Sequence, residues 1–150
     1  MMAMIMLAIL TTGLVACSSD DDNNGGGNIS VTEAELIGTW ESVVAESYVI
    51  AEGKRYSFID IEVEEDYRVV YKTDHNYGVS YWNSNTQTWV EGSYDVGTWS
   101  LSGNMLTINT GKGTTTGTIT EFSASRMVVK DTDTKNGVTY DEYAVFKKVN

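Results

Sequence analysis

The feature that most constrains the fold is a two-residue alternation of apolar and polar side chains that runs, with short interruptions, from residue 39 to residue 148. A period of two is typical of β-strands that bury one face. The alternation predicts eight or nine strands, near residues 39–50, 55–63, 67–74, 78–82, 88–101, 105–110, 114–122, 126–132 and 138–148. We therefore predict an all-β chain.

Short turn signals rich in Gly, Asn and Ser separate these runs, for example SGN at 102–104 and TKNG at 134–137. Regular short connections predict an antiparallel up-and-down meander. The chain has no proline, and no long helical pattern that could cover an open sheet follows residue 39. Closing the sheet on itself removes both of its unpaired edges. The sequence thus predicts an antiparallel up-and-down β-barrel of eight strands, or nine.

A short helical turn is expected just before the first strand. Thr32 is a suitable N-cap, Glu35 follows it by three residues, and Gly38 ends the turn. This spacing is typical of a capping box, in which the two side chains satisfy each other's free backbone N–H groups.

The first 28 residues differ in composition from the rest and predict a leader and a tether. Residues 3–16 form an apolar run that is shorter than the roughly 18 to 20 residues that a membrane-spanning helix needs. Cys17 ends this run and is the single cysteine of the chain, and residues 18–28 have no large apolar side chain to bury. We expect a signal peptide over 1–16, a flexible acidic and glycine-rich tether with its cysteine over 17–28, and one barrel domain over 29–150.

The segment Leu14-Val15-Ala16-Cys17 resembles the lipobox of bacterial lipoproteins. The resemblance implies that Cys17 carries acyl chains such as palmitate and becomes the N-terminus after cleavage. Two or more acyl chains give stable attachment to a bilayer. The acidic run 20–22 resembles the signal that exports lipoproteins of some Gram-negative bacteria to the outer face of the outer membrane, or it keeps the tether soluble and extended. We expect an outer-membrane lipoprotein that is exposed at the cell surface.

Two further motifs resemble those of lipocalins. Gly38-Thr39-Trp40 resembles the G-x-W signature at the base of the lipocalin barrel, and GSYDVGTWSLSGNMLTI at 92–108 is similar to a pattern of small bacterial lipocalin-like lipoproteins. The resemblance implies an eight-stranded barrel with Gly38 and Trp40 at its closed end. It also implies a cation near the end of the last strand that packs on Trp40. Lys147 and Lys148 are the candidates here, where the usual residue is arginine.

The alternation predicts an aromatic barrel interior. The residues that we expect to contact a ligand are Tyr48, Tyr71, Tyr94, Trp99 and Tyr140. Tyr94 and Trp99 differ in parity along the strand expected over 88–101, so we predict a β-bulge at Gly97 that turns both inward. An eight-stranded barrel is wide enough either to be filled by its own side chains or to hold one small ligand.

Two functions are compatible with these features. One is a membrane-anchored protein that binds a small hydrophobic or aromatic-stacking ligand inside the barrel. The other is an interaction module with a filled barrel, such as an accessory subunit of a surface uptake complex, a glycan binder or an inhibitor, which acts through its loops. The second function would use exposed aromatic residues, namely Tyr77, Tyr81, Trp82 and Trp89.

Catalysis, a cofactor, a metal site and nucleic-acid binding are not expected. The net charge is −11 and the chain has no basic run, so no positively charged surface that could bind nucleic acid is expected. The single histidine, His75, has one carboxylate beside it and no cysteine nearby. Alternation places Asp60, Glu62 and Glu64 together on the expected solvent face of a strand. GKGTTTG at 111–117 is expected in a hairpin rather than before a helix, so it is not a phosphate-binding loop.

Overall fold

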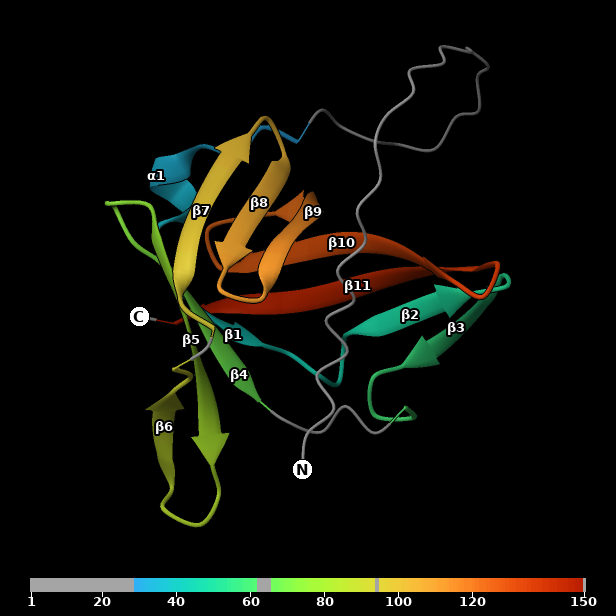
Figure 1. The fold of residues 1–150 in the computed structure, drawn as a ribbon, viewed down its shortest axis with the longest axis horizontal. Coiled ribbons are helices and arrows are strands. Elements are labelled where there is room, and N and C mark those ends of the chain that lie inside the picture. The colour runs from blue at the N-terminus through green and yellow to red at the C-terminus, as the bar shows by residue number, and fades with distance from the viewer. Residues whose placement is uncertain (1–28, 62–65, 94, 150) are drawn as a thin grey trace.

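The computed structural model describes residues 29–61, 66–93 and 95–149 (Figure 1). The predicted signal peptide, Cys17 and the tether lie outside the described residues, and so does Tyr94. The elements are α1 (Glu33–Leu36), β1 (Gly38–Ser42), β2 (Tyr48–Ala51), β3 (Lys54–Ser57), β4 (Tyr67–Tyr71), β5 (Asn76–Asn83), β6 (Thr88–Glu91), β7 (Gly97–Ser102), β8 (Met105–Thr110), β9 (Gly113–Phe122), β10 (Arg126–Lys135) and β11 (Val138–Val149). Within the described ranges, no helix has the length and apolar character needed to cross a membrane.

Eight of these strands form a closed antiparallel barrel. Their order around the ring is β1-β4-β5-β7-β8-β9-β10-β11, and β1 closes the ring because it pairs with both β4 and β11. This confirms the predicted eight-stranded antiparallel barrel. Neighbours in the ring are also neighbours along the chain, apart from the strands outside the ring, which is the connectivity of an up-and-down meander.

The other three strands extend the sheet beyond the ring. β2 pairs with the first half of β11 and β3 pairs with β2, so the long β10–β11 hairpin continues into a projecting four-stranded sheet (Figure 1). β6 pairs with the far end of β5. Both extensions lie at the end of the barrel opposite α1, and we call this end the mouth and the α1 end the base (Figure 1).

The helical turn at the base forms as predicted. The Glu35 backbone N–H donates to Thr32 Oγ1, and Glu35 Oε2 accepts from the Thr32 backbone N–H at 3.0 Å. The capping box orients α1 so that Leu36 is fully buried. Trp40 is also fully buried, and its Nε1 donates to the Leu36 carbonyl at 2.8 Å.

The predicted cation on Trp40 is Lys148. Its Nζ lies 5.0 Å from the centre of the Trp40 ring and donates to the Glu35 carbonyl at 2.7 Å. Lys147 has the opposite orientation, and its Nζ contacts Glu41 Oε1 at 2.7 Å. The Trp40 indole thus binds the helix through its N–H and Lys148 through its ring face, which explains why tryptophan is suited to this position.

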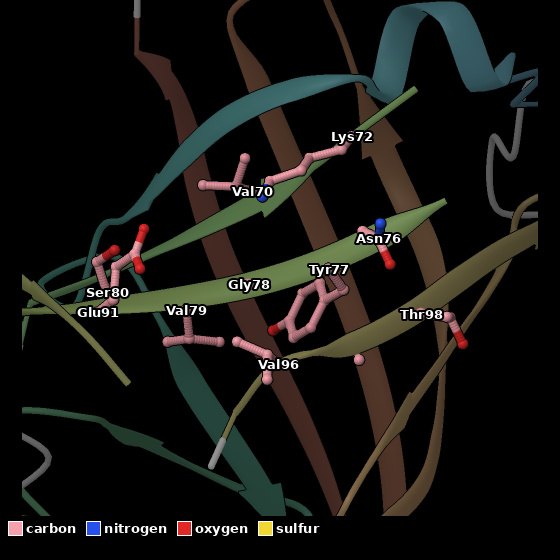
Figure 2. A pocket seen from close by; sticks show the side chains of 11 residues that line it. Val70, Lys72, Asn76, Tyr77, Gly78, Val79, Ser80, Glu91, Val96 and Thr98 are labelled. Carbon is pink, nitrogen blue, oxygen red and sulfur yellow. The ribbon is translucent and has the colours of Figure 1, made fainter. Parts of the chain in front are cut away.

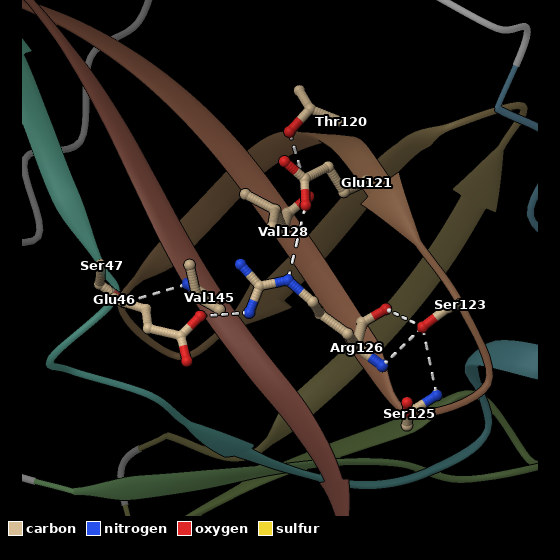
Figure 3. Close-up of polar contacts among 9 residues, drawn as sticks. All are labelled: Glu46, Ser47, Thr120, Glu121, Ser123, Ser125, Arg126, Val128 and Val145. Atoms are coloured by element: carbon tan, nitrogen blue, oxygen red, sulfur yellow. Dashed lines mark hydrogen bonds and ion pairs between the residues drawn. The ribbon is translucent and has the colours of Figure 1, made fainter.

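The strand predicted over 39–50 is interrupted, which corrects that boundary. Residues 43–47 leave β1 and form a tight connection before β2. Ser47 Oγ accepts from the Val145 backbone N–H and donates to the Val43 carbonyl, both at 3.0 Å. Figure 3 shows Arg126 beside this connection, between Glu46 and Glu121. The strand predicted over 55–63 is also shorter, because β3 ends at Ser57.

The β-bulge predicted at Gly97 is wrong. The expected strand over 88–101 is two strands, β6 and β7, and Gly97 pairs regularly with Thr110 in β8. A register shift of this kind occurs instead between β9 and β10, at Val128/Val129. It lets Ile119 and Phe122, three residues apart on β9, both pack on the core.

Candidate functional site: the tyrosine wall of the barrel

Two adjacent strands supply a wall of tyrosines to the barrel interior. β4 and β5 pair so that Tyr67 is opposite Tyr81, Val69 is opposite Val79 and Tyr71 is opposite Tyr77. Side chains of the same parity share one face of a strand, and the buried Val69 and Val79 identify this face as the inner one. We call Tyr67, Tyr71, Tyr77 and Tyr81 the tyrosine wall.

Other aromatic rings join this wall. The Tyr71 ring centre lies 5.6 Å from Tyr77 and 5.6 Å from Trp99, and Tyr67 meets Phe146 edge-on at 5.8 Å. Trp99 is held in place because its Nε1 donates to the Lys72 carbonyl at 3.0 Å. These rings form a continuous surface from the base toward the mouth.

The opposite wall of the barrel is mostly aliphatic. β9 and β10 lie across the ring from β4 and β5, and side chains from them and from β8 fill this side of the core. The members are Leu106, Ile108, Ile119, Met127 and Val129. The interior therefore combines an aromatic wall that carries hydroxyl groups with an apolar wall that carries none.

Three hydroxyls of the tyrosine wall border space that protein atoms do not fill. Within the described residues, the hydroxyls of Tyr67, Tyr71 and Tyr77 make no hydrogen bond, and no buried polar side-chain atom lacks a partner. Both statements hold only if each of these hydroxyls borders space that a water molecule can occupy. Yet Tyr71 is only 3% exposed, so its hydroxyl reaches that space from a buried position.

Burial raises the pKa of all three tyrosines. It is the main cause for Tyr67, Tyr71 and Tyr77, because a low-dielectric interior disfavours the phenolate. Smaller contributions come from neighbours: Glu142 acts on Tyr67, Tyr67 on Tyr71, and Tyr71 on Tyr77. The tyrosines therefore stay neutral hydrogen-bonding groups at physiological pH.

The fourth tyrosine belongs to a hydrogen-bonded cluster near the mouth. Tyr81 donates its hydroxyl to Asp95 Oδ2 at 2.9 Å, and Lys112 Nζ contacts Asp95 Oδ1 at 2.6 Å. Asp95 is buried, so Lys112 supplies the charge that makes burial of this carboxylate tolerable. The cluster ties the segment before β7 to the turn between β8 and β9.

Among the residues that the structure describes, no cation pairs with a second carboxylate at the mouth, that of Glu142. Glu142 is exposed and lies on the same face of β11 as Ala144 and Phe146, which pack on the core. Asp131 is directly opposite it on β10. Partial desolvation, and then the like charge of Asp131, raise the pKa of Glu142.

The structure brings together two of the predicted ligand-contacting residues. Tyr71 and Trp99 are buried and touch in the interior. Tyr48 lies on β2, outside the ring, where its ring stacks on Tyr143 at 4.6 Å and Arg55 covers it at 3.6 Å. Tyr140 lies on the projecting part of β11 and is 36% exposed. Tyr94 lies outside the described residues.

Sequence reasoning assigned Tyr77 and Tyr81 to the surface, but both are half-buried and face inward. The signal was present in the alternation of Tyr77, Val79 and Tyr81. Trp82 and Trp89 do face outward, pair across β5 and β6 at 5.4 Å, and leave Trp82 41% exposed.

His75 is a turn residue between β4 and β5 with φ of 61°. Its Nε2 lies 3.2 Å from Glu33 Oε2, and its ring lies 5.0 Å from that of Trp99. It therefore connects this turn to α1 and to the interior aromatic cluster.

A groove of about 400 Å³ marks the outside of the barrel where β5 and β7 diverge (Figure 2). Val70, Lys72, Ser80 and Thr98 are among the residues that line it, and so is Tyr77 of the tyrosine wall. Gly78 has no side chain to close it, since nothing lies within 4 Å of where its Cβ would be. A second open groove, of about 410 Å³, lies beside residues 41–45 and Lys147.

Comparison with known proteins gives one family and one group of solved structures. The family model described as a lipocalin-like domain matches residues 36–129. Bovine odorant-binding protein with a selenium-containing odorant is 15% identical, with a TM-score of 0.44, over 90% of this chain and 78% of that one. The same bovine protein with its natural ligand is 17% identical, with a TM-score of 0.43, over 86% of this chain and 78% of that one. Among curated proteins, none matches this chain.

Proposed function

This chain belongs to the lipocalin-like domain family, and we propose that it is a membrane-anchored lipoprotein that binds one small hydrophobic or aromatic-stacking ligand inside its barrel. The observation that carries the proposal is the pairing of the two walls. Hydroxyls of Tyr67, Tyr71 and Tyr77 border space that protein atoms do not fill, and a mostly aliphatic wall lies across from them. Binding sites for small molecules combine apolar surface with a few polar groups in this way.

The aromatic wall favours a flat or aliphatic guest over a polar one. Tyrosine rings offer large apolar faces and one hydroxyl each, which can orient a guest by a hydrogen bond. Because burial raises the pKa of these tyrosines, they act as neutral donors and acceptors rather than as charges.

Anchoring through Cys17 is the second part of the proposal. It rests on the lipobox-like segment 14–17 and on the acidic and glycine-rich tether that follows it. Acyl chains on Cys17 would hold the barrel at the bilayer, and the acidic residues 20–22 support export to the cell surface.

The proposed interior site is tested with N-phenyl-1-naphthylamine, a neutral apolar dye that accepts energy from tryptophan. Residues 28–150 contain every described contact and are used without the leader. We expect saturable quenching of tryptophan emission by the dye, largely lost in Trp99→Phe because Trp99 lies in the interior cluster. Trp82→Phe is the matched control, since Trp82 is on the outer surface, and it keeps the quenching. A dye that never saturates would overturn the proposed function.

A second candidate function is glycan binding on the outside of the barrel. The observation that favours it is the Trp82–Trp89 pair, in which Trp82 is exposed beside the outer groove that Ser80 and Glu91 help to line. Indole faces stack on sugar rings, and Arg68 already covers Trp89 at 4.0 Å. Binding of short oligosaccharides that is lost in Trp82→Phe and kept in Trp99→Phe would support this candidate over the first.

A further inference from the structure

We propose that the guest of this barrel is a cationic amphiphile, a primary amine or quaternary ammonium with an apolar tail, whose charged group lies between Tyr67 and Glu142. The inference rests on the proposed function, since it names the chemical class of the interior ligand. Three observations carry it. The first is the aromatic wall, the second is a pair of carboxylates at the mouth without an ion pair among the described residues, and the third is that nearby lysines already pair with other carboxylates.

The aromatic wall suits a cation. Aromatic faces attract ammonium groups through the negative charge of the ring face, and pockets of several rings bind quaternary ammonium groups. Tyr67, Tyr71, Tyr77 and Trp99 place four rings along one side of the interior. Tyr71 in addition is 3% exposed and has a hydroxyl without a hydrogen bond in the described chain, so a polar group points into this interior from a buried position.

The mouth next to these rings is negative. Glu142 lies on the inner face of β11, two positions from Ala144 and four from Phe146, and Phe146 contacts Tyr67. Asp131 is directly across from Glu142 on β10. Two like charges placed opposite each other destabilise a sheet, and a bound cation would remove that cost.

Two basic residues on these strands are held on the other face. Lys130 contacts Asp141 at 3.1 Å, and Lys147 contacts Glu41 at 2.7 Å, both on the outer side of these strands. At the other side of the mouth, Lys112 neutralises Asp95. No ion pair in the described chain involves Glu142 or Asp131, so their charge is available to a guest.

The aliphatic wall determines the chemistry of the rest of the ligand, which is expected to be an apolar tail. A guest whose charge lies at the mouth extends its tail toward the base, past Tyr71 and against Ile119 and Met127, which are fully buried. This arrangement disfavours fatty acids, whose carboxylate would lie beside Glu142. It favours an amine over an alcohol of the same length.

The test is displacement of N-phenyl-1-naphthylamine from residues 28–150 by octylamine, 1-octanol and octanoate at pH 7 and 0.15 M salt. We expect octylammonium to displace the dye at roughly tenfold lower concentration than octanol, which corresponds to one charge-assisted contact, and octanoate to be the weakest. In Glu142→Gln the difference between octylammonium and octanol should disappear. Glu121→Gln removes the same charge from the outer face and should keep the difference.

The outcomes separate the two proposals. If the dye binds but octanol competes as well as octylammonium, the ammonium inference is overturned and the proposed function stands. If the preference for octylammonium survives in Glu142→Gln, the assignment of the charge to Glu142 is wrong. If the dye does not bind at all, the proposed function fails first. Glu142→Gln relieves repulsion with Asp131, so it is expected to fold, and the same dye reports whether it does.

Discussion

Gly38 and Gly97 show at the residue scale why glycine is required at two places in the barrel wall. Gly38 has φ of +133°, which side chains other than hydrogen rarely allow, and Lys148 Cε would lie 3.0 Å from an added Cβ. Gly97 has an ordinary φ, but its Cβ would lie 1.8 Å from the Asn109 carbonyl oxygen. The first glycine lets Lys148 reach Trp40, and the second lets β7 approach β8.

Replacing Gly97 tests this close approach. Gly97→Ala places a methyl group against the Asn109 backbone, which cannot move without breaking the pairing of β7 with β8. We expect a loss of about 1–3 kcal/mol or more in the free energy of unfolding, measured by urea denaturation. Gly78→Ala is the control, because its Cβ meets nothing within 4 Å, and it should leave the stability within about 1 kcal/mol. Equal losses in both variants would contradict the role given to Gly97.

The carboxyl of Glu142 predicts a pH-dependent effect on stability. Its pKa is raised above the usual 4.5, so the folded state binds this proton more tightly than the unfolded state. The stabilisation from the protonated group is therefore present below pH 4.5 and is lost as the pH rises through the pKa that Glu142 has in the folded state. Glu142→Gln should be more stable than the wild type at pH 7, and this gain should disappear below 4.5.

The pKa of Glu41 is shifted in the opposite direction to that of Glu142, so Glu41 serves as the comparison. Burial alone would raise its pKa, but hydrogen bonds from Lys147 and Arg68 outweigh burial and lower it below 4.5. Its stabilisation is present above 4.5 and is lost as the pH falls through the folded pKa. Glu41→Gln should therefore be destabilised at pH 7. The measurement is urea denaturation of both variants and the wild type at pH 4 and pH 7. If the free energy of unfolding relative to the wild type changed in the same direction for both variants between these pH values, the roles given to both carboxyl groups would be contradicted.

At the scale of elements, most strands and the ring they form could be predicted, because alternation and turn residues are local signals. The α1 cap, β8, β9 and β10 follow from such signals. The break at 43–47 and the one before β7 could not, because Ser47 and Asp95 are held by partners far away in the sequence. These are Val145 on β11 and Lys112 in the turn between β8 and β9. The interior positions of Tyr71 and Trp99 follow from parity. The alternation around Val79 carries the same signal for Tyr77, and the pairing of β5 with β4 shows which face is the inner one.

Ser47 is expected to hold the β1–β2 connection against β11. Ser47→Ala leaves the Val145 N–H buried without an acceptor, so we expect a loss of about 1–3 kcal/mol in the free energy of unfolding. Ser100→Ala, on the exposed face of β7, should be neutral. A neutral Ser47→Ala in thermal denaturation would mean that the connection is held by its backbone alone.

At the scale of the whole molecule, one closed ring carries two projecting sheets at the same end. β2–β3 and β6 both lie at the mouth, and α1 closes the base (Figure 1). A guest that enters through the mouth therefore passes between the projections. In the proposed lipoprotein, the tether joins the chain just before α1, so the base lies closer to the attachment point along the chain than the mouth does.

Attachment through Cys17 is tested in a Gram-negative expression host. We expect an alkyne-labelled palmitate to be incorporated into the full-length chain and the protein to sediment with membranes. Cys17→Ser should lose the label and leave the membrane fraction, whereas Ser18→Ala should change neither. Incorporation of the label into Cys17→Ser would show that acylation, if present, is at another residue.

The seam between β5 and β7 has a consequence for how the barrel exchanges its contents. β5 and β7 pair at two positions, Asn76 with Thr98 and Tyr77 with Gly97, and one further bond joins the Trp99 N–H to the His75 carbonyl, whereas β10 and β11 pair at ten positions. A closed barrel opens into a sheet when two neighbouring strands separate. The pair of strands with the fewest hydrogen bonds between them is expected to separate most often. Opening there would join the outer groove to the barrel interior and provide a second route for a guest, whose rate of opening is set by a few hydrogen bonds rather than by the loops at the mouth.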